Sequence, residues 1–371
     1  MRVFGILVLI LLLVAAGAVA FYWVAMHQPY GNLPADGVFV EIPHGTSARG
    51  VAQILQRAGI IRSALAFDVY GRRHPKRPLE AGEYFFDHAE SGKDVFWKLA
   101  NGEVYQQPFV VREGQTMFDI ARQLEAEKHM SAAEFLKAAK NSELILDLDP
   151  TARTLEGFLF PATYNLPRHV SAVELTAMMV KKFREAMSQI AADPAETNSV
   201  LPGQTMKVVT LASLVERETP KAEERPVVAG VYSNRLEKGM LLQCDPTVIY
   251  ALEQAGKYKG ALTLKDLRID SPYNTYVHAG LPPGPIGNPG IASLRAALQP
   301  AATPYLYFVA NTQGGHFFAA TLEEHNRNVA KYHRLLNGQS AEAPAAAPAP
   351  TPVPLPPMRP TGKLTGYKVA R

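Results

Sequence analysis

The N-terminus carries a run of residues that a water-soluble domain could not easily fold around. Between Val3 and Met26 there are 24 residues without a charged side chain. At about 1.5 Å per helical residue, such a run spans a hydrocarbon core of roughly 30 Å with room to tilt. Arg2 precedes the run, and positive charge on the short N-terminal side places the rest of the chain outside the cytoplasm. The sequence therefore predicts a single-pass membrane anchor over residues 1–27.

A cleaved signal peptide is the alternative for this segment, because Ala18-Val19-Ala20 resembles a cleavage site. The apolar core of a signal peptide runs about 7 to 15 residues, and this run is longer. The length favours an uncleaved anchor. The predicted location is the inner (cytoplasmic) membrane, with the folded part on the periplasmic side.

The charge balance limits the class of partner. The net charge is +4, and the segment 338–371 contributes +3 of it, from four Lys and Arg against Glu342. A nearly neutral folded part argues against nucleic acid as the main partner. The same segment is rich in Pro and Ala, which is typical of an extended or disordered tail. The single cysteine permits no internal disulfide.

No motif for a cofactor or metal stands out. His278, His316 and His325 lack the spacing of a zinc site, and no glycine-rich phosphate loop is present. Cys244 is expected to be a small packing residue, with a nucleophile as the remote alternative. We therefore expect neither a cofactor nor a metal.

An internal repeat follows the predicted anchor. Residues 40–55 and 111–124 each read as a short strand, a Gly turn and a helix with apolar positions facing the strand. The unit resembles LysM-type modules, which implies contact with N-acetylated sugars; a compact scaffold is the other interpretation. We place a LysM-like α/β domain at 36–105 and a connecting α/β region with the second unit at 106–203.

A helix that ends on an acid is the strongest chemical signal. Leu211, Leu214, Val215 and Glu218 have the i, i+3, i+4, i+7 spacing of one helix face, and Pro220 predicts that the helix stops near Glu218. The negative end of the helix dipole and apolar surroundings both disfavour ionisation, so we expect a raised pKa for Glu218. A raised glutamate pKa suits a general acid. An ordinary surface glutamate is the competing interpretation.

The segment 224–289 is dense in Pro, Gly and neutral polar residues. Pro and Gly fix the shape of loops, while Gln, Asn, Thr and Tyr offer uncharged hydrogen bonds and ring faces. This chemistry favours an uncharged, hydroxyl-rich ligand such as a glycan over a phosphate.

Five blocks in this half of the chain also carry a resemblance. They are LASLVERET, ERPVVAGVYSNRL, GMLLQCDPTVIYAL, SPYNTYVHAGLPPGPIGNPG and ATPYLYFVANTQGGHFFAATLEEHN. In this order they resemble the YceG-like family, over roughly residues 38–335. The familiar member of the family has Thr where this chain has Cys244. The resemblance implies a membrane-anchored endolytic murein (peptidoglycan) lytic transglycosylase with glycan strands as substrate. It also implies functional ties to penicillin-binding synthases.

The resemblance implies roles for particular residues. Glu218 would act as general acid and then as base, closing a 1,6-anhydro ring on MurNAc without water. Gln243, Asn274 and Tyr276 are the candidates for holding the N-acetyl group and ring oxygens. The remaining substrate-site candidates are Thr219, Glu224 and Asp245. We expect Thr219 to form a hydrogen bond with Glu218, and Glu224 and Asp245 to orient neighbouring residues or to interact with Arg235.

Alternatives stay open at this point. Glu216 and Glu224 are rivals for the acid, and Glu156 is a further carboxylate, in a block whose Phe158 and Phe160 we expect in the core. A muramidase would use water and pair Glu218 with Asp245 or Glu224. A non-catalytic, membrane-tethered glycan-binding scaffold is the third possibility.

The expected fold class is α+β: a transmembrane helix, a small LysM-like domain and an α-rich, lysozyme-like catalytic domain over 204–337. The pattern predicts helices over 172–191, 205–218, 223–237, 246–255 and 291–298, with loops through 271–290 and a strand over 305–310.

Overall fold

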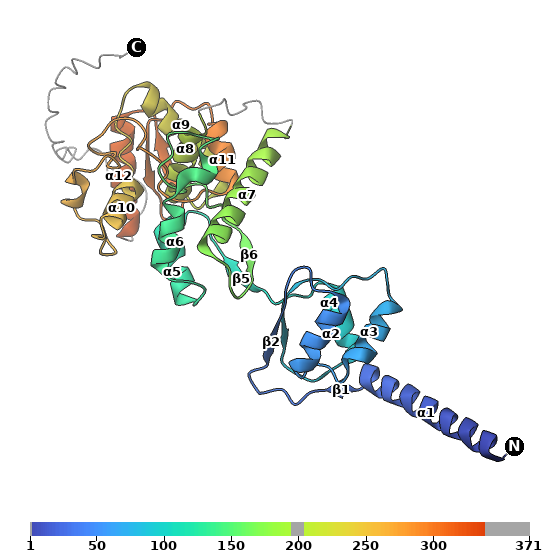
Figure 1. Ribbon diagram of the computed structural model, residues 1–371. Coiled ribbons are helices and arrows are strands. Elements are labelled where there is room, and N and C mark those ends of the chain that lie inside the picture. The colour runs from blue at the N-terminus through green and yellow to red at the C-terminus, as the bar shows by residue number, and fades with distance from the viewer. Residues whose placement is uncertain (1, 194–203, 338–371) are drawn as a thin grey trace, which may run out of the picture. The chain divides into compact units, whose positions relative to one another are not determined.

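The computed structural model describes residues 2–193 and 204–337 (Figure 1). The chain divides into two compact units, Met1–Pro304 and Tyr305–Arg371. This boundary falls inside the range 204–337 predicted for the catalytic domain, so the last part of that range belongs to a separate unit. The predicted tail over 338–371 and the loop before Pro202 lie outside the described residues.

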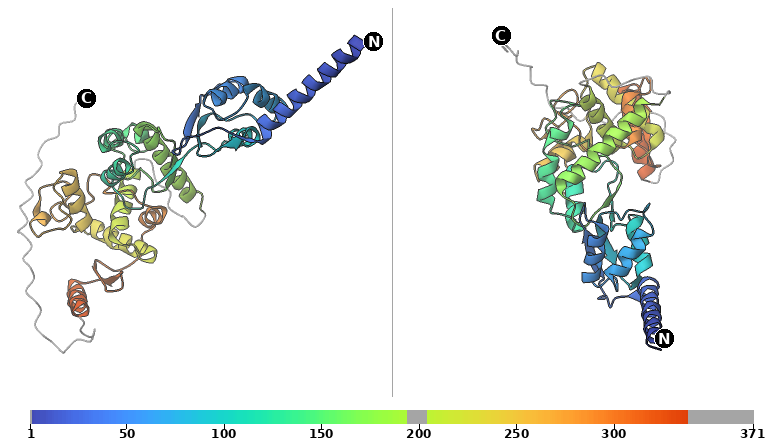
Figure 2. Two further views of the ribbon diagram at one scale, coloured as in Figure 1. Left: turned by 90° about the horizontal axis from the view of Figure 1, so that it is seen from below. Right: turned by 45° about the vertical axis from the view of Figure 1, so that its right-hand side comes forward.

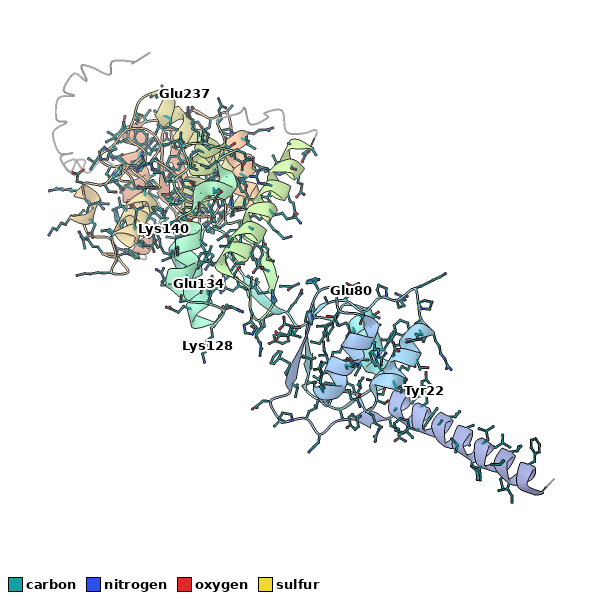
Figure 3. The ribbon with its side chains drawn as sticks, in the orientation of Figure 1. Tyr22, Glu80, Lys128, Glu134, Lys140 and Glu237 are labelled. Carbon is teal, nitrogen blue, oxygen red and sulfur yellow. The ribbon has the colours of Figure 1, made fainter. Side chains whose placement is uncertain are left out.

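Helix α1 (Arg2–His27) is one continuous helix in every view (Figures 1 and 2). Figure 3 shows side chains projecting from both sides of it, and its apolar residues from Phe4 to Val14 are exposed. Its segment Phe4–His27 is long and apolar enough to cross a membrane. Near its C-terminal end the helix changes character, because Ala25 and Met26 are buried in the core of the module that follows.

The first module has the order strand, helix, helix, strand. It consists of β2 (Val38–Ile42), α2 (Ala48–Arg57), α3 (Ala64–Arg72) and β3 (Gly82–Phe86). The two strands pair antiparallel, and Val40, Leu55, Tyr84 and Phe86 are among the residues of its core. A short pair, β1 (Pro29–Tyr30) with β4 (Glu90–Ser91), and α4 (Gly92–Ala100) complete it.

The second module repeats this order. It consists of β5 (Gln107–Val110), α5 (Met117–Ala126), α6 (Ala132–Ala139), the 3-10 turn η1 (Ser142–Ile145) and β6 (Thr163–Leu166). The strands β5 and β6 again pair antiparallel. The internal repeat in the sequence is therefore a repeat of structure (Figure 1). Glycan binding by either module stays a prediction.

The turn between strand and helix is built in the same way in both modules. Gly45 and Gly114 have φ of 78° and 76°, a conformation that glycine adopts at little cost. A hydroxyl residue then caps each helix: Ser47 accepts from the N–H of Gly50, and Thr116 forms a capping box with Asp119. These local signals explain why the repeat could be recognised in the sequence.

A group of helices follows the second module and surrounds the predicted acid. They are α7 (Ala172–Ala191), α8 (Thr205–Glu218), α9 (Arg225–Glu237), α10 (Asp245–Gln254) and α11 (Ile291–Leu298), with the 3-10 turns η2 (Ala222–Glu224) and η3 (Asp266–Arg268). Helix α8 packs against α9, α10 and α11. The predicted ranges of α7, α8 and α11 are confirmed, and those of α9 and α10 are confirmed to within two residues.

The unit that begins at Tyr305 contains a hairpin and a helix. Strands β7 (Tyr307–Ala310) and β8 (His316–Ala319) pair antiparallel, and α12 (Leu322–Leu336) packs on them (Figure 2). The strand predicted over 305–310 is therefore confirmed with a later start.

Candidate active site

Helix α8 positions Glu218 as its last residue. Leu211, Leu214 and Val215 are buried and bind the helix to its neighbours. Thr219 leaves helical geometry with φ −134° and ψ 130°, as the following Pro220 demands. The predicted end of the helix is confirmed, and the Glu218 side chain is half-buried.

Two neutral donors hold one oxygen of this carboxyl group. The Tyr232 hydroxyl, from the middle of α9, donates to Oε2 of Glu218 at 3.1 Å. The Cys244 thiol, from the residue before α10, donates to the same atom at 3.4 Å. Tyr232 and Cys244 are each only 1% exposed. Three helices thus converge on Oε2 of Glu218.

Both donors keep their protons at neutral pH. Burial, reinforced by the nearby Glu218, raises the pKa of Cys244 well above that of an ordinary thiol. Burial is likewise the main cause that raises the pKa of the Tyr232 hydroxyl. A buried, protonated thiol is a poor nucleophile, because the thiolate is the reactive form. The geometry therefore favours Cys244 as a hydrogen-bond donor to the acid.

A cluster of hydroxyl groups fixes the turn that carries Cys244. Thr275 Oγ1 accepts from the Cys244 N–H at 3.0 Å, and the Thr247 hydroxyl donates to the Cys244 carbonyl at 2.7 Å. The two threonine hydroxyls lie 2.9 Å apart. All three residues are buried. The loop over 271–276 is thereby attached to the start of α10.

Gln243 directly precedes Cys244 in the sequence, and Tyr276 directly follows Thr275. Both residues belong to the same group of contacts around the start of α10. Gln243 has φ of 51°, unusual for a residue other than glycine, and its N–H donates to the Thr275 carbonyl at 3.1 Å. The Tyr276 hydroxyl donates to Oδ1 of Asp245 at 2.5 Å. Burial first, and then the bond to Asp245, raises the pKa of Tyr276. Sequence-predicted Gln243, Asp245 and Tyr276 thus come together next to Cys244.

Asn274 has a different surrounding from the one predicted. It has no exposed surface, and its amide N–H groups donate to the carbonyls of Leu267 and Ile269 at 3.1 and 2.9 Å. Its Oδ1 accepts from the Tyr276 N–H at 3.0 Å. This geometry favours a role in shaping the loop, in place of direct contact with a ligand.

Thr219 also differs from its predicted contact. Its hydroxyl donates to Oε2 of Glu224 at 3.2 Å and accepts from the Lys221 N–H at 3.2 Å. Glu224 is the N-cap residue of α9. Arg235 donates to the carbonyls of Leu241 and Leu242. Thr219 therefore links the end of α8 to the start of α9.

Glu216, a rival for the acid, is engaged in a buried ion pair. Its Oε1 lies 2.7 Å from Arg225 Nη2, and its Oε2 accepts from the Gly290 N–H at 2.9 Å. Arg225 also lies 3.3 Å from a carboxyl oxygen of Glu113. Although burial raises the pKa of Glu216, its contacts tie α8 to α9 and to the loop before α11. This arrangement is structural.

Glu156 lies in a second buried polar group. Both of its carboxyl oxygens accept from the Met117 N–H at the start of α5, and Oε1 also accepts from Nδ2 of Asn288 at 3.0 Å. It is 1% exposed, and burial raises its pKa to about 8. Phe158 nearby is fully buried, as predicted, and Phe160 is half-buried.

Asn288 connects three segments that are distant in sequence. Its Oδ1 accepts from the N–H groups of Gly157 and Leu159, both at 2.9 Å. Its Nδ2 donates to the Gln115 carbonyl at 2.8 Å as well as to Glu156. The loop before α11 is thereby joined to the second module.

Sequence reasoning did not assign a site role to Tyr232, Thr247, Thr275 or Asn288. A tyrosine on a helix and threonines in loops carry no local sign of the partner they meet. Within residues 2–193 and 204–337, no three His, Cys, Asp or Glu side chains are grouped so as to hold a metal ion.

Comparisons with known proteins identify relatives of this chain. A family model described as the YceG-like family matches residues 40–331. An endolytic murein transglycosylase of Bacillus subtilis (strain 168) is 35% identical, covering 85% of this chain and 90% of the relative. One from Streptococcus pneumoniae serotype 2 (strain D39 / NCTC 7466) is 32% identical, covering 89% of this chain and 65% of the relative.

A solved structure is also similar. The crystal structure of a YceG-like protein from Listeria monocytogenes has 34% sequence identity and a TM-score of 0.50, covering 79% of this chain and 99% of that chain. The family model alone spans most of the chain, from the first module through the greater part of α12. The chain belongs to the YceG-like family.

Proposed function

We propose that this protein is an endolytic murein transglycosylase that cleaves the MurNAc–GlcNAc bond inside glycan strands, with Glu218 as its catalytic residue. The observation that carries the proposal is the placement of Glu218 at the end of α8, with Oε2 held by Tyr232 and Cys244. The names of the Bacillus and Streptococcus relatives support the reaction class.

The chemistry needs one carboxyl group in two roles. Protonated Glu218 gives its proton to the glycosidic oxygen as the bond from that oxygen to C1 of MurNAc breaks. The carboxylate then takes the proton of the C6 hydroxyl, whose oxygen bonds to C1 and closes the 1,6-anhydro ring. Glu218 ends protonated again, and no water is consumed. Assistance by the N-acetyl group of the same sugar removes the need for a carboxylate nucleophile.

The surroundings suit this double role. Tyr232 and Cys244 keep their protons and are uncharged, so these two hydrogen bonds orient the carboxyl group and add no positive charge beside it. Gln243 and the Tyr276–Asp245 pair stand next to Cys244 and are assigned to hold the sugar. Asn274, Thr219 and Glu224 are assigned to positioning the loop and helix ends that carry these groups.

Helix α1 supports a membrane location for this protein. A single apolar helix at the N-terminus, followed by folded units that act on cell-wall polymer, is consistent with a single-pass protein whose catalytic part is extracytoplasmic. The positive-inside rule leaves the short N-terminal segment in the cytoplasm, and we propose the inner membrane as the location, with the catalytic part on the periplasmic side. Cooperation with penicillin-binding synthases is part of the same proposal.

The test is product analysis with the full-length protein in detergent. Wild-type protein and Glu218→Gln are incubated with uncross-linked glycan strands, and mass spectrometry identifies the new MurNAc ends. We expect ends that are lighter by one water than a reducing sugar, and their absence with Glu218→Gln. The matched control is Glu223→Gln. Glu223 is an exposed glutamate close to Glu218 in the sequence, so this variant should retain full activity.

Other products would overturn the proposal in distinguishable ways. Reducing MurNAc ends would identify a muramidase and call for a second carboxylate. Cleavage by Glu218→Gln at the wild-type rate would remove Glu218 from the mechanism. Strand binding without cleavage by folded wild-type protein would identify a scaffold.

A further inference from the structure

A cavity of about 620 Å³ lies between the N-terminal half of α8, the end of α9 and the loop over 281–283. Lys207 and Thr210 line it from α8, and Leu236 lines it from α9. None of the site residues discussed above contributes to its wall. The cavity therefore has no assigned role in the proposed reaction.

The cavity is built on the elements that hold the acid. Lys207 and Glu218 are eleven residues apart on α8, which is about three turns or roughly 16 Å along the helix axis, and the residues between them on this face, Leu211 and Leu214, are buried. On α9, Leu236 lies one turn beyond Tyr232, which donates to Glu218. The loop that gives Tyr276 to the site gives Leu281 to the cavity five residues later. The cavity therefore lies roughly 16 Å along α8 from Glu218, within reach of a group that is attached to a strand bound at Glu218.

The wall of the cavity differs from a sugar-binding surface. Its described lining contains no aromatic side chain and has aliphatic surface from Met206, Leu236, Leu281, Pro282 and Pro283. Sugar rings are commonly bound on aromatic faces, whereas aliphatic walls suit small side chains such as the methyl group of alanine. The composition of the wall favours a peptide over a sugar.

Lys207 supplies a charge for such a ligand. Its side chain is exposed, and no carboxylate among the described residues forms an ion pair with it. Asp149 also lines the cavity but is 4% exposed, and its Oδ1 accepts from the N–H and hydroxyl of Thr151 in its own turn. The ammonium group of Lys207 is thus available to a carboxylate that enters from solvent.

In murein, a short peptide rich in alanine and carboxylates is attached to the lactyl group of MurNAc. We infer that the cavity binds this peptide stem on a MurNAc residue near the scissile bond, with Lys207 facing a stem carboxylate. This inference rests on the proposed function, since it takes the glycan strand to lie across Glu218. The cavity would then make the enzyme prefer strands that still carry their peptides.

The experiment compares two substrates with the full-length protein in detergent. One is uncross-linked strands with intact peptide stems, and the other is the same strands after an amidase has removed the stems. Lys207→Met should raise KM for the peptide-bearing strands about fivefold, the effect of losing a partly exposed ion pair. It should leave cleavage of the bare strands unchanged. Lys259→Met, in an exposed lysine outside the cavity, is the control for loss of charge.

A second variant tests the volume of the cavity. Leu281→Trp fills part of it and should also affect only the peptide-bearing strands. An equal loss on both substrates would show that the cavity binds sugar, and unchanged kinetics on both would show that it binds neither; each result overturns the inference.

The inference can also be tested if the proposed reaction fails. Binding of a soluble muramyl peptide to wild-type protein and to Lys207→Met is measured by calorimetry, without any cleavage. Weaker binding to the variant supports the cavity as a peptide site even if no glycosidic bond is cut. Equal binding to both proteins overturns it.

Discussion

Glu218 shares one oxygen with two uncharged donors from different helices, so the orientation of its carboxyl group depends on both of them. A carboxyl group that must give and then accept a proton gains from donors that fix its plane without removing its basicity. The separation of roles is clear at this scale: Tyr232 and Cys244 hold the acid, and threonines hold Cys244.

Replacing Tyr232 with Phe tests this arrangement. The change removes one hydrogen bond to Oε2 and keeps the ring that packs in the core. We expect kcat to fall about tenfold, in line with the net worth of one hydrogen bond to a charged group, with KM little changed. Initial rates of strand cleavage measure the change in kcat.

Cys244→Thr is the control, because it keeps a donor of similar size at the other position and should lose little activity. An unaltered kcat for Tyr232→Phe would contradict the proposed role of Tyr232 in holding Glu218.

Glu156 should make stability depend on pH. Its pKa is raised to about 8 in the folded protein, against about 4.3 in an unfolded chain. The folded state therefore binds a proton that the unfolded state has lost. The stabilising contribution is complete below about pH 4.3 and is lost as pH rises towards 8, by at most about 1.4 kcal/mol per unit.

Glu156→Gln imitates the protonated form and should remove this contribution to the slope. Urea unfolding at several values between pH 5 and 8 measures the free energy of unfolding of each protein. We expect a flatter profile for Glu156→Gln than for wild type. Glu80→Gln, at an exposed glutamate, should follow the wild-type profile (Figure 3). Parallel profiles for Glu156→Gln and wild type would mean that Glu156 is ionised in the folded protein.

The sequence predicted where some single residues lie, but it did not predict which residues they contact. The position of Glu218 at a helix end follows from Pro220 and the apolar spacing, which are local. Its partners Tyr232 and Cys244 are 14 and 26 residues away, and they meet it only through the packing angles of three helices. An asparagine such as Asn274 looks the same in sequence whether it contacts a ligand or satisfies the carbonyls of its own loop.

Among the elements, the loop before α11 depends on Asn288 for its attachment to the second module. Asn288→Ala would leave the buried N–H groups of Gly157 and Leu159 without their acceptor and the Gln115 carbonyl without this donor. Unpaired buried groups cost roughly 1–3 kcal/mol each, so we expect a loss of at least about 3 kcal/mol in the free energy of unfolding. Thermal or urea unfolding measures the loss. Asn165→Ala, on the exposed side of β6, should change stability by less than about 0.5 kcal/mol.

Helices were more predictable than strand pairs for a physical reason. Helices such as α7 and α8 are specified by periodicity, by caps such as the Ser171–Glu174 capping box, or by a following proline, all within a few residues. Strand β5 pairs with β6 more than fifty residues later, and nothing within either strand identifies its partner. The repeat was visible because its turn and cap are local, whereas its closing strands were found only in the structure.

For the whole molecule, the choice between an uncleaved anchor and a signal peptide can be tested on the mature protein. Helix α1 continues past Ala20 to His27, and Ala25 and Met26 enter the core of the first module. We expect the mature protein in the membrane fraction to retain its first twenty residues. The intact mass of protein purified from membranes, with N-terminal sequencing, measures this. A mature chain that begins at Phe21 would contradict the anchor.

The join between α1 and the first module has a mechanical consequence. The end of α1 packs on α3 and α4, and a side chain at Gly92 would collide with the Ala25 carbonyl at 2.8 Å. The end of α1 belongs to the core of the first module, so no flexible linker separates the two. We therefore expect the proposed anchor to be rigidly connected to this module. A tilt of the helix in the bilayer must then turn the first module with it. The orientation of the first module would therefore depend on the tilt of α1 and, through the tilt, on the thickness of the bilayer.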